Sequence, residues 1–241
     1  MWNEKLTYLT LLTGSILFPL IFSFEKNVHF VQYRKELMIS ILVSGLFFIV
    51  WDVLFTYLGF WSFNSRYVLG PHLLGLPFEE WLFFVVIPYC SLFIYEVAGF
   101  YLKNFSFNSI LKIILNLTAL AFLIVAFIGF GKWYTFITLL FNAFLLAYFV
   151  NNKITKAHLS QFVISFLVAC VPMLVVNGVL TSLPVVEYNS LYFSNVRIAD
   201  IPVEDFSYFL LLMTANVLVY ERVKVSTRKQ MLFGRTPLTG K

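Results

Sequence analysis

Two short stretches of the sequence each place two neighbouring acidic side chains just after a proline, at the start of a long apolar run. They read Pro77-Phe78-Glu79-Glu80-Trp81 and Pro202-Val203-Glu204-Asp205-Phe206. The second stretch follows the first at an offset of 125 residues. An ionised carboxylate is costly inside a bilayer, so acids at the edge of an apolar run are candidates for a functional role.

Four carboxyl groups around one apolar cavity would not all stay ionised, because burial and mutual repulsion favour the neutral acid. A neutral carboxyl group in such a cavity is suited to giving a proton to a weakly basic group, and an alkene is such a group. The acid and base candidates are Glu79, Glu80, Glu204 and Asp205. The alternative is simple capping of two helix N-termini, where free N–H groups and the helix dipole attract negative charge.

Several residues near these acids are candidates for supporting them. Asp52 lies within an apolar run, and Asn177 stands at the same place 125 residues later, so we expect both to position the acids by hydrogen bonds. Pro77 and Pro202 are helix-entry residues. Aromatic faces stabilise a carbocation, and the predicted substrate contacts are Trp51, Trp81, Phe84, Phe206 and Phe209, with Phe83 and Tyr208 as further aromatic faces. Plain packing is the alternative for each of these rings.

The composition indicates a helical membrane protein. Of 241 residues, 60% are hydrophobic and 12% are charged, against about 25% charged in soluble domains. Seven apolar runs approach the length that crosses a bilayer as a helix, whereas the short alternating segments of a β-barrel are not visible. The predicted spans are about 5–23, 38–57, 79–101, 110–130, 133–150, 160–181 and 204–221. The first run lacks the features of a cleaved signal peptide and is expected to remain as a span.

An internal repeat sets the predicted organisation. Residues 51–96 align with residues 176–221 without a gap. The identical pairs in this alignment begin at Thr56, Leu58, Asn64, Ser65, Tyr67, Pro77, Glu79, Phe84, Tyr95 and Glu96. We therefore predict an all-α integral membrane fold of two parallel three-helix repeats, residues 1–109 and 131–241, joined by a linker helix in 110–130.

The basic residues predict the orientation. Thirteen of the 17 Lys and Arg residues fall on the side that carries the C-terminal tail, which is therefore cytoplasmic, with the N-terminus outside. The basic tail is expected to contact lipid headgroups rather than nucleic acid. On the opposite side, the loops 58–78 and 182–203 are unusually apolar, and we expect them to fold back onto the bundle.

The motifs resemble those of the small, membrane-bound lycopene cyclase domain family, in its fused two-domain bacterial form. The residues that carry the resemblance are the two carboxylate motifs, the Tyr-Glu that ends each following span, Trp51-Asp52, and Asn177-Gly178-Val179-Leu180-Thr181. The resemblance implies an isomerase, or intramolecular lyase, of carotenoid biosynthesis in the bacterial inner membrane, beside other carotenoid-pathway enzymes. Its substrate would be lycopene or a related linear carotenoid. Protonation of the terminal double bond, attack by the internal double bond and loss of a ring proton would give the β-ionone ring of β-carotene.

Other interpretations stay open at this point. A cyclase of C50 carotenoids shares the same resemblance, and a proton-coupled transporter of an apolar solute would also use intramembrane acids. A non-catalytic carotenoid-binding subunit is a third alternative, whereas a retinal protein would need a lysine in the middle of a span. The chain has no Gly-x-Gly-x-x-Gly motif and no ligand cluster among its two cysteines and three histidines, so we expect no flavin and no metal.

Overall fold

The computed structural model describes residues 3–103 and 106–233. Its seven long helices are α1 Thr7–Phe22, α2 Arg34–Tyr57, α3 Phe78–Tyr101, α4 Asn108–Ile128, α5 Trp133–Asn151, α6 Leu159–Ser182 and α7 Val203–Phe233. Short 3₁₀ turns, Glu4–Leu6, Phe30–Tyr33 and Thr155–Ala157, precede α1, α2 and α6. Each of the seven long helices is long and apolar enough to cross a membrane, which confirms the predicted all-α class and fits a membrane protein.

The predicted spans and the observed helices differ most at the C-terminus. The prediction ends the last span at residue 221, but α7 continues to Phe233. The added segment is charged and contains no proline or glycine, so the helix continues beyond its apolar part. Arg235 and Lys241 of the predicted basic tail lie outside the described residues.

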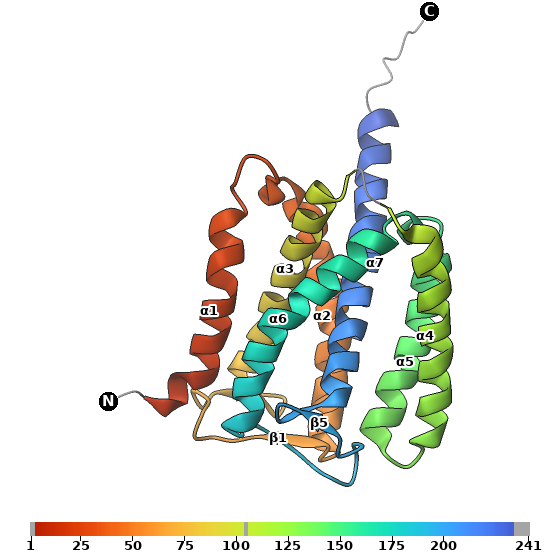
Figure 1. Ribbon diagram of the computed structural model, residues 1–241. Coiled ribbons are helices and arrows are strands. Elements are labelled where there is room, and N and C mark those ends of the chain that lie inside the picture. The colour runs from red at the N-terminus through yellow and green to blue at the C-terminus, as the bar shows by residue number, and fades with distance from the viewer. Residues whose placement is uncertain (1–2, 104–105, 234–241) are drawn as a thin grey trace, which may run out of the picture.

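The two apolar loops form small β-structures at the end of the bundle where α3 and α7 begin (Figure 1). Strand β1 (Trp61–Phe63) pairs antiparallel with β4 (Val186–Tyr188), with Trp61 opposite Tyr188. Hairpins join β2 (His72–Leu73) to β3 (Leu76–Pro77) and β5 (Arg197–Ile198) to β6 (Ile201–Pro202). Val68 in the first loop and Val185, directly before β4, are fully buried, so these loops do pack onto the bundle as predicted.

The elements of the two loops and of two helices have matching bounds. The starts and the ends of α2 and α6, β1 and β4, β2 and β5, and β3 and β6 all differ by 125 residues. The hairpin turns also match, since Leu74 and Gly75 have positive φ values of 54° and 85° and Ala199 and Asp200 have values of 48° and 65°. Two successive positive φ values are typical of the tight type I′ hairpin turn. The two carboxylate motifs therefore follow hairpins of the same form.

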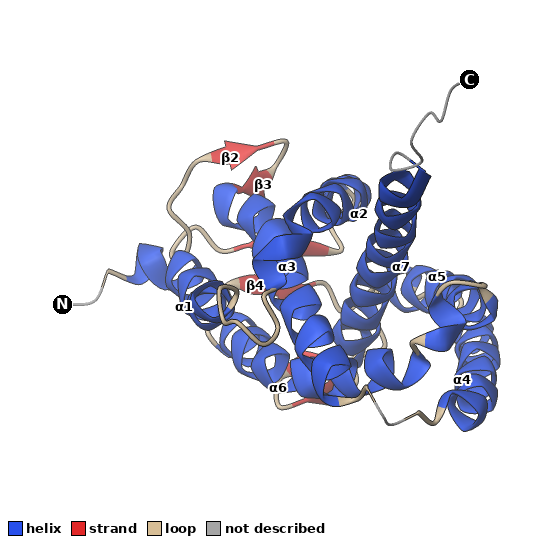
Figure 2. Cartoon of the chain, turned by 90° about the horizontal axis from the view of Figure 1, so that it is seen from above, coloured by secondary structure: helices blue, strands red, loops and turns tan. Residues whose placement is uncertain are grey.

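Seen from above, α3 and α7 lie in the middle of the bundle (Figure 2). Helices α1 and α6 flank them on one side, α2 and α5 lie on the other, and α4 packs against α5 at the edge. Among the described residues of α4, only Ala119 and Ala126 are buried, so most of this helix faces outward.

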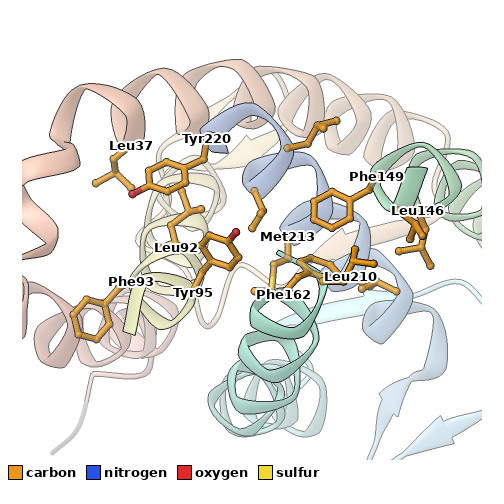
Figure 3. Packing of buried hydrophobic residues seen from close by; sticks show 14 of the residues in the cluster. Leu37, Leu92, Phe93, Tyr95, Leu146, Phe149, Phe162, Leu210, Met213 and Tyr220 are labelled. Carbon is orange, nitrogen blue, oxygen red and sulfur yellow. The ribbon is translucent and has the colours of Figure 1, made fainter. Parts of the chain in front are cut away.

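Two apolar clusters hold the central helices together. Near the end of the bundle opposite the hairpins, Tyr95, Phe149, Phe162 and Tyr220 pack between α3, α5, α6 and α7 (Figure 3). Nearer the hairpins, an aromatic cluster that includes Phe48 and Trp51 fills the space between α2, α5 and α7. The carboxylate motifs thus lie at the starts of closely packed helices, α3 and α7, which favours precise placement of their side chains.

Candidate active site

The hairpins set where each carboxylate pair begins. Pro77 has an extended backbone (φ −64°, ψ 153°) and is both the last residue of strand β3 and the N-cap of α3. Pro202 occupies the same place before α7. Both prolines are buried. Since proline cannot donate a backbone hydrogen bond, it ends the hairpin and begins the helix without leaving a donor unpaired.

The first acid of each pair binds its own loop. The Glu79 Oε1 atom accepts a hydrogen bond from the Leu69 backbone N–H at 2.7 Å. The Glu204 Oε1 atom accepts one from the Ser194 backbone N–H at 2.8 Å and one from the Thr135 hydroxyl at 2.5 Å. In both cases the backbone donor lies ten residues before the acid. Glu79 and Glu204 therefore hold their loops to the helix starts.

The second acid of the first pair points into a cavity. Glu80 is buried and accepts a hydrogen bond from the Tyr8 hydroxyl at 2.5 Å. Asp52 lines the same cavity and interacts electrostatically with Glu80. The Asp52 Oδ2 atom is buried and has no hydrogen-bond partner among the described residues. A pair of acids with so few donors does not easily hold two negative charges.

The second acid of the other pair has a richer set of donors. Asp205 accepts hydrogen bonds from the Tyr134 hydroxyl at 2.8 Å, the Tyr188 hydroxyl at 2.7 Å and the Asn177 amide at 3.0 Å. Burial and the nearby Asp205 carboxyl group raise the pKa of Tyr188 above its ordinary value, so this phenol in the loop strand stays protonated and donates. Three donors favour the ionised form of the carboxyl group they surround.

Glu80 and Asp205 both line a single cavity of about 640 Å³. Its polar end is formed by Tyr8, Asp52, Glu80, Tyr134, Asn177, Tyr188 and Asp205. From there the cavity continues between α1, α3 and α6, where its lining is mainly apolar. Such a volume lies in the usual range for small-molecule sites. The arrangement offers proton donors and acceptors to one end of an apolar molecule.

The structure places some of the aromatic residues predicted to contact the substrate at the cavity. Phe209 lines the cavity, as do Phe83 and Tyr208. Trp51 and Phe84 instead belong to the aromatic cluster between α2, α5 and α7, outside the cavity lining.

The remaining two predicted rings, Trp81 and Phe206, also lie outside the lining. The Trp81 indole N–H donates to the Leu73 carbonyl at 3.2 Å and so contacts the first hairpin. Both residues directly follow a motif acid in the sequence, and the side chains of adjacent residues point in different directions from a helix.

Sequence reasoning missed the tyrosines that bind the acids. Tyr8 and Tyr134 lie in the first turns of α1 and α5, and Tyr188 lies in β4. None of them is close to a carboxylate motif in the sequence. The available signal was that each lies at the end of the bundle where the motifs begin.

The described residues offer little for binding a metal ion. Within residues 3–103 and 106–233, no group of three or more His, Cys, Asp or Glu side chains is arranged to hold one. Cys90 lines the cavity, where its thiol donates to the Ser15 carbonyl at 3.4 Å, and it forms no disulfide with Cys170.

Comparison with known proteins gives one match. A family model described as "Lycopene cyclase" matches residues 5–98 and 131–223. The two matched segments contain both carboxylate pairs, and the unmatched interval between them contains α4. No curated protein and no solved structure matches the chain.

Proposed function

Because the chain belongs to the lycopene cyclase family, we propose that it is a lycopene β-cyclase that closes the ends of lycopene into β-ionone rings. The family implies a carotenoid-cyclising enzyme with a linear carotenoid substrate. The observation that carries the finer proposal is the meeting of Glu80 and Asp205 at the polar end of one apolar cavity. A linear carotene is apolar along its whole length, so it suits such a cavity.

Glu80 is the proposed proton donor. Its carboxyl group has a hydrogen bond from Tyr8 and the acidic neighbour Asp52, an environment that favours retention of a proton. Transfer of this proton to the terminal double bond forms a C–H bond and leaves a tertiary carbocation. The π electrons of the internal double bond then form the ring C–C bond, which moves the positive charge onto the ring.

Asp205 is the proposed proton acceptor. Its donors Tyr134, Tyr188 and Asn177 favour the ionised carboxylate. Removal of a ring proton by this carboxylate regenerates a double bond and ends the reaction. One proton is added and one is lost, so the product is an isomer of the substrate and no electrons are exchanged with a cofactor.

The cavity lining suits the cationic intermediate. The rings of Phe83, Tyr208 and Phe209 offer π faces that attract a cation without bonding to it. The mainly apolar lining disfavours water, which would otherwise capture the cation as an alcohol. Glu79 and Glu204 are proposed to act indirectly, by fixing the loops that close the polar end.

We also propose the architecture that the sequence repeat predicts. Residues 1–109 and 131–241 would be two parallel repeats joined by a linker helix in 110–130, and the shared offset of 125 residues between the bounds of α2 and α6 supports this. The bacterial inner membrane is the proposed location, with the N-terminus outside and the C-terminus cytoplasmic. The excess of basic residues on one side supports this orientation.

The test is expression of the chain in cells that accumulate lycopene, with the pigments analysed by chromatography. We expect β-carotene or its one-ring precursor. Replacement of Glu80 by Gln or Asp205 by Asn should leave lycopene uncyclised while the protein remains in the membrane. Unchanged lycopene with abundant wild-type protein would refute the β-cyclase proposal.

A C50 carotenoid cyclase is the second proposal. The cavity lining includes side chains that are also exposed on the outer surface of the bundle, so the cavity opens outward and does not limit the total length of the substrate. Supply of a linear C50 carotenoid in place of lycopene distinguishes the two substrates.

A further inference from the structure

The two halves of the bundle differ in the space beside their carboxylate pairs. The cavity lies between α1, α3 and α6. The corresponding helices at an offset of about 125 residues are α5, α7 and α2. Between these helices aromatic rings are in contact, with centroids 5.1 Å apart for Trp51 and Phe141 and 6.0 Å apart for Phe47 and Phe141. One space is therefore open and its counterpart is filled.

The difference can be traced to residue size at matching positions. Four cavity-lining residues of α6 are smaller or more flexible than their α2 counterparts, which lie 125 positions earlier. These four are Pro172, Met173, Val176 and Leu180, and their counterparts in α2 are Phe47, Phe48, Trp51 and Phe55. Helix α2 thus carries four aromatic rings where α6 carries aliphatic side chains. Rings of that size fill the space beside α2 that corresponds to the cavity beside α6.

Prolines distinguish the same helices. Pro19, Pro88 and Pro172 lie inside α1, α3 and α6, which are three of the helices that line the cavity. The sequences of α2, α4, α5 and α7 contain no proline. An internal proline removes a backbone hydrogen bond and bends the helix away from its ring. An internal proline in each of these three helices therefore works against close packing along their length.

The cavity reaches the outer surface of the bundle between α1 and α6. Phe18 of α1 and Val168 and Val171 of α6 line the cavity and are 61%, 51% and 64% exposed. On α3 the lining runs from Glu80 to Ile94, which corresponds to about 21 Å at 1.5 Å per residue. The hydrocarbon core of a bilayer is about 30 Å thick. The opening thus leads from the lipid to the buried acids along a long apolar path.

We propose that the cleft between α1 and α6 is the port through which a linear polyene enters from the bilayer, one end at a time. The identity of the polyene rests on the proposed function, whereas the port itself requires only binding. Glu80 and Asp205 mark the inner end of the path, and the exposed lining of α1 and α6 marks its mouth. The corresponding space between α2 and α5 is filled by aromatic rings and has no room for a second polyene.

Exposed valines of α6 provide a matched test. Val171 lines the cavity, whereas Val175, one turn later and 62% exposed, does not. Val171→Trp should block the port and Val175→Trp should not. A second pair tests a deeper position. Met173→Phe introduces the residue type found at the matching α2 position, and Leu174→Phe is its control outside the lining.

Two readouts are needed, with each variant purified in lipid nanodiscs and checked for amount and thermal stability. Retention of added lycopene, measured by its visible absorbance, reports binding, and chromatography reports cyclisation. We expect Val171→Trp and Met173→Phe to lose roughly ten-fold or more in both readouts, and their controls to match wild type.

The outcomes separate the port from the chemistry. Cyclisation by wild type and by both blocking variants alike would overturn the port and leave the proposed function standing. Wild type that binds lycopene in a Val171-dependent way without cyclising it would support the port and overturn the function. Equal retention of lycopene by all variants would overturn the port.

Discussion

The two acids of the first motif should respond differently to the same conservative substitution. Glu79→Gln and Glu80→Gln each replace one buried carboxyl group by an amide of nearly the same shape. Glu80 faces the cavity and is the proposed proton donor, whereas Glu79 holds the Leu69 backbone outside the cavity. The expected losses are therefore of rate in one case and of stability in the other.

The size of each effect follows from the contacts. An amide at position 80 still accepts the Tyr8 hydrogen bond but has no acidic proton to give. General acid catalysis contributes about 10²–10⁴-fold, which corresponds to about 2.7–5.5 kcal/mol of activation free energy. At position 79 the amide disturbs the hydrogen bond from the Leu69 backbone N–H and buries new donors where Glu79 Oε2 has no partner among the described residues. Such losses cost about 1–3 kcal/mol of unfolding free energy.

The assay measures both quantities on the same samples. Purified variants in nanodiscs are given lycopene, products are quantified by chromatography per mole of folded protein, and thermal unfolding is recorded. For a chain of this size about 1–3 kcal/mol corresponds to a fall in Tm of roughly 2–12 °C. Glu187→Gln, at an exposed acid that pairs with Asn64 in the same loop region, is the control and should leave both quantities near wild type.

One result would refute the assignment. If Glu79→Gln abolished the rate at normal Tm while Glu80→Gln stayed active, the donor would be the loop-binding acid and the cavity geometry would have misled the reasoning. Equal loss of rate in both variants at normal Tm would also contradict the separation of roles.

Three further predictions test other parts of the site. Tyr188→Phe removes one of the hydrogen bonds that favour the ionised form of Asp205 and should slow cyclisation about ten-fold or more at unchanged expression. Tyr192→Phe, at a ring that stacks on Phe60, should match wild type in the same pigment assay. Trp51→Ala should cost about 3–5 kcal/mol of stability, read from thermal unfolding, but the folded fraction should keep its cyclase activity because Trp51 lies outside the cavity lining. With scarce enzyme and excess lycopene, a time course should show released one-ring product before the two-ring product, because a single cavity processes one end at each binding event. Direct appearance of the two-ring product would contradict this.

The sequence predicted the helices and the location of the acids well, because both depend on local patterns. Apolar runs of span length became seven long helices, and the two proline-acid motifs begin α3 and α7. The repeat at an offset of 125 residues predicted equivalent loops, but the two hairpins were not predicted, since their turn residues Leu74-Gly75 and Ala199-Asp200 differ in sequence.

The cavity could not be predicted in this way. Its shape depends on which of two similar interfaces is filled, and that is decided by the combined volume of side chains from helices distant in the sequence. Trp51 illustrates the difficulty, because its place one residue before Asp52 suggested the cavity, but its ring points to α5 and contacts Phe141. The tyrosine donors were missed for the same reason, since Tyr8 is 72 residues from its partner Glu80.

The proposed reaction gives a physical reason for unequal halves. It needs one carboxyl group that carries a proton and another that lacks one, at the same end of the same substrate. Two identical environments would give both acids the same protonation state. In this chain an acid, Asp52, matches a neutral amide, Asn177, and the acceptor Asp205 has three hydrogen-bond donors where the structure assigns one, Tyr8, to Glu80. The same duplicated framework thus holds one acid suited to give a proton and one suited to take it, beside the open cavity between α1, α3 and α6.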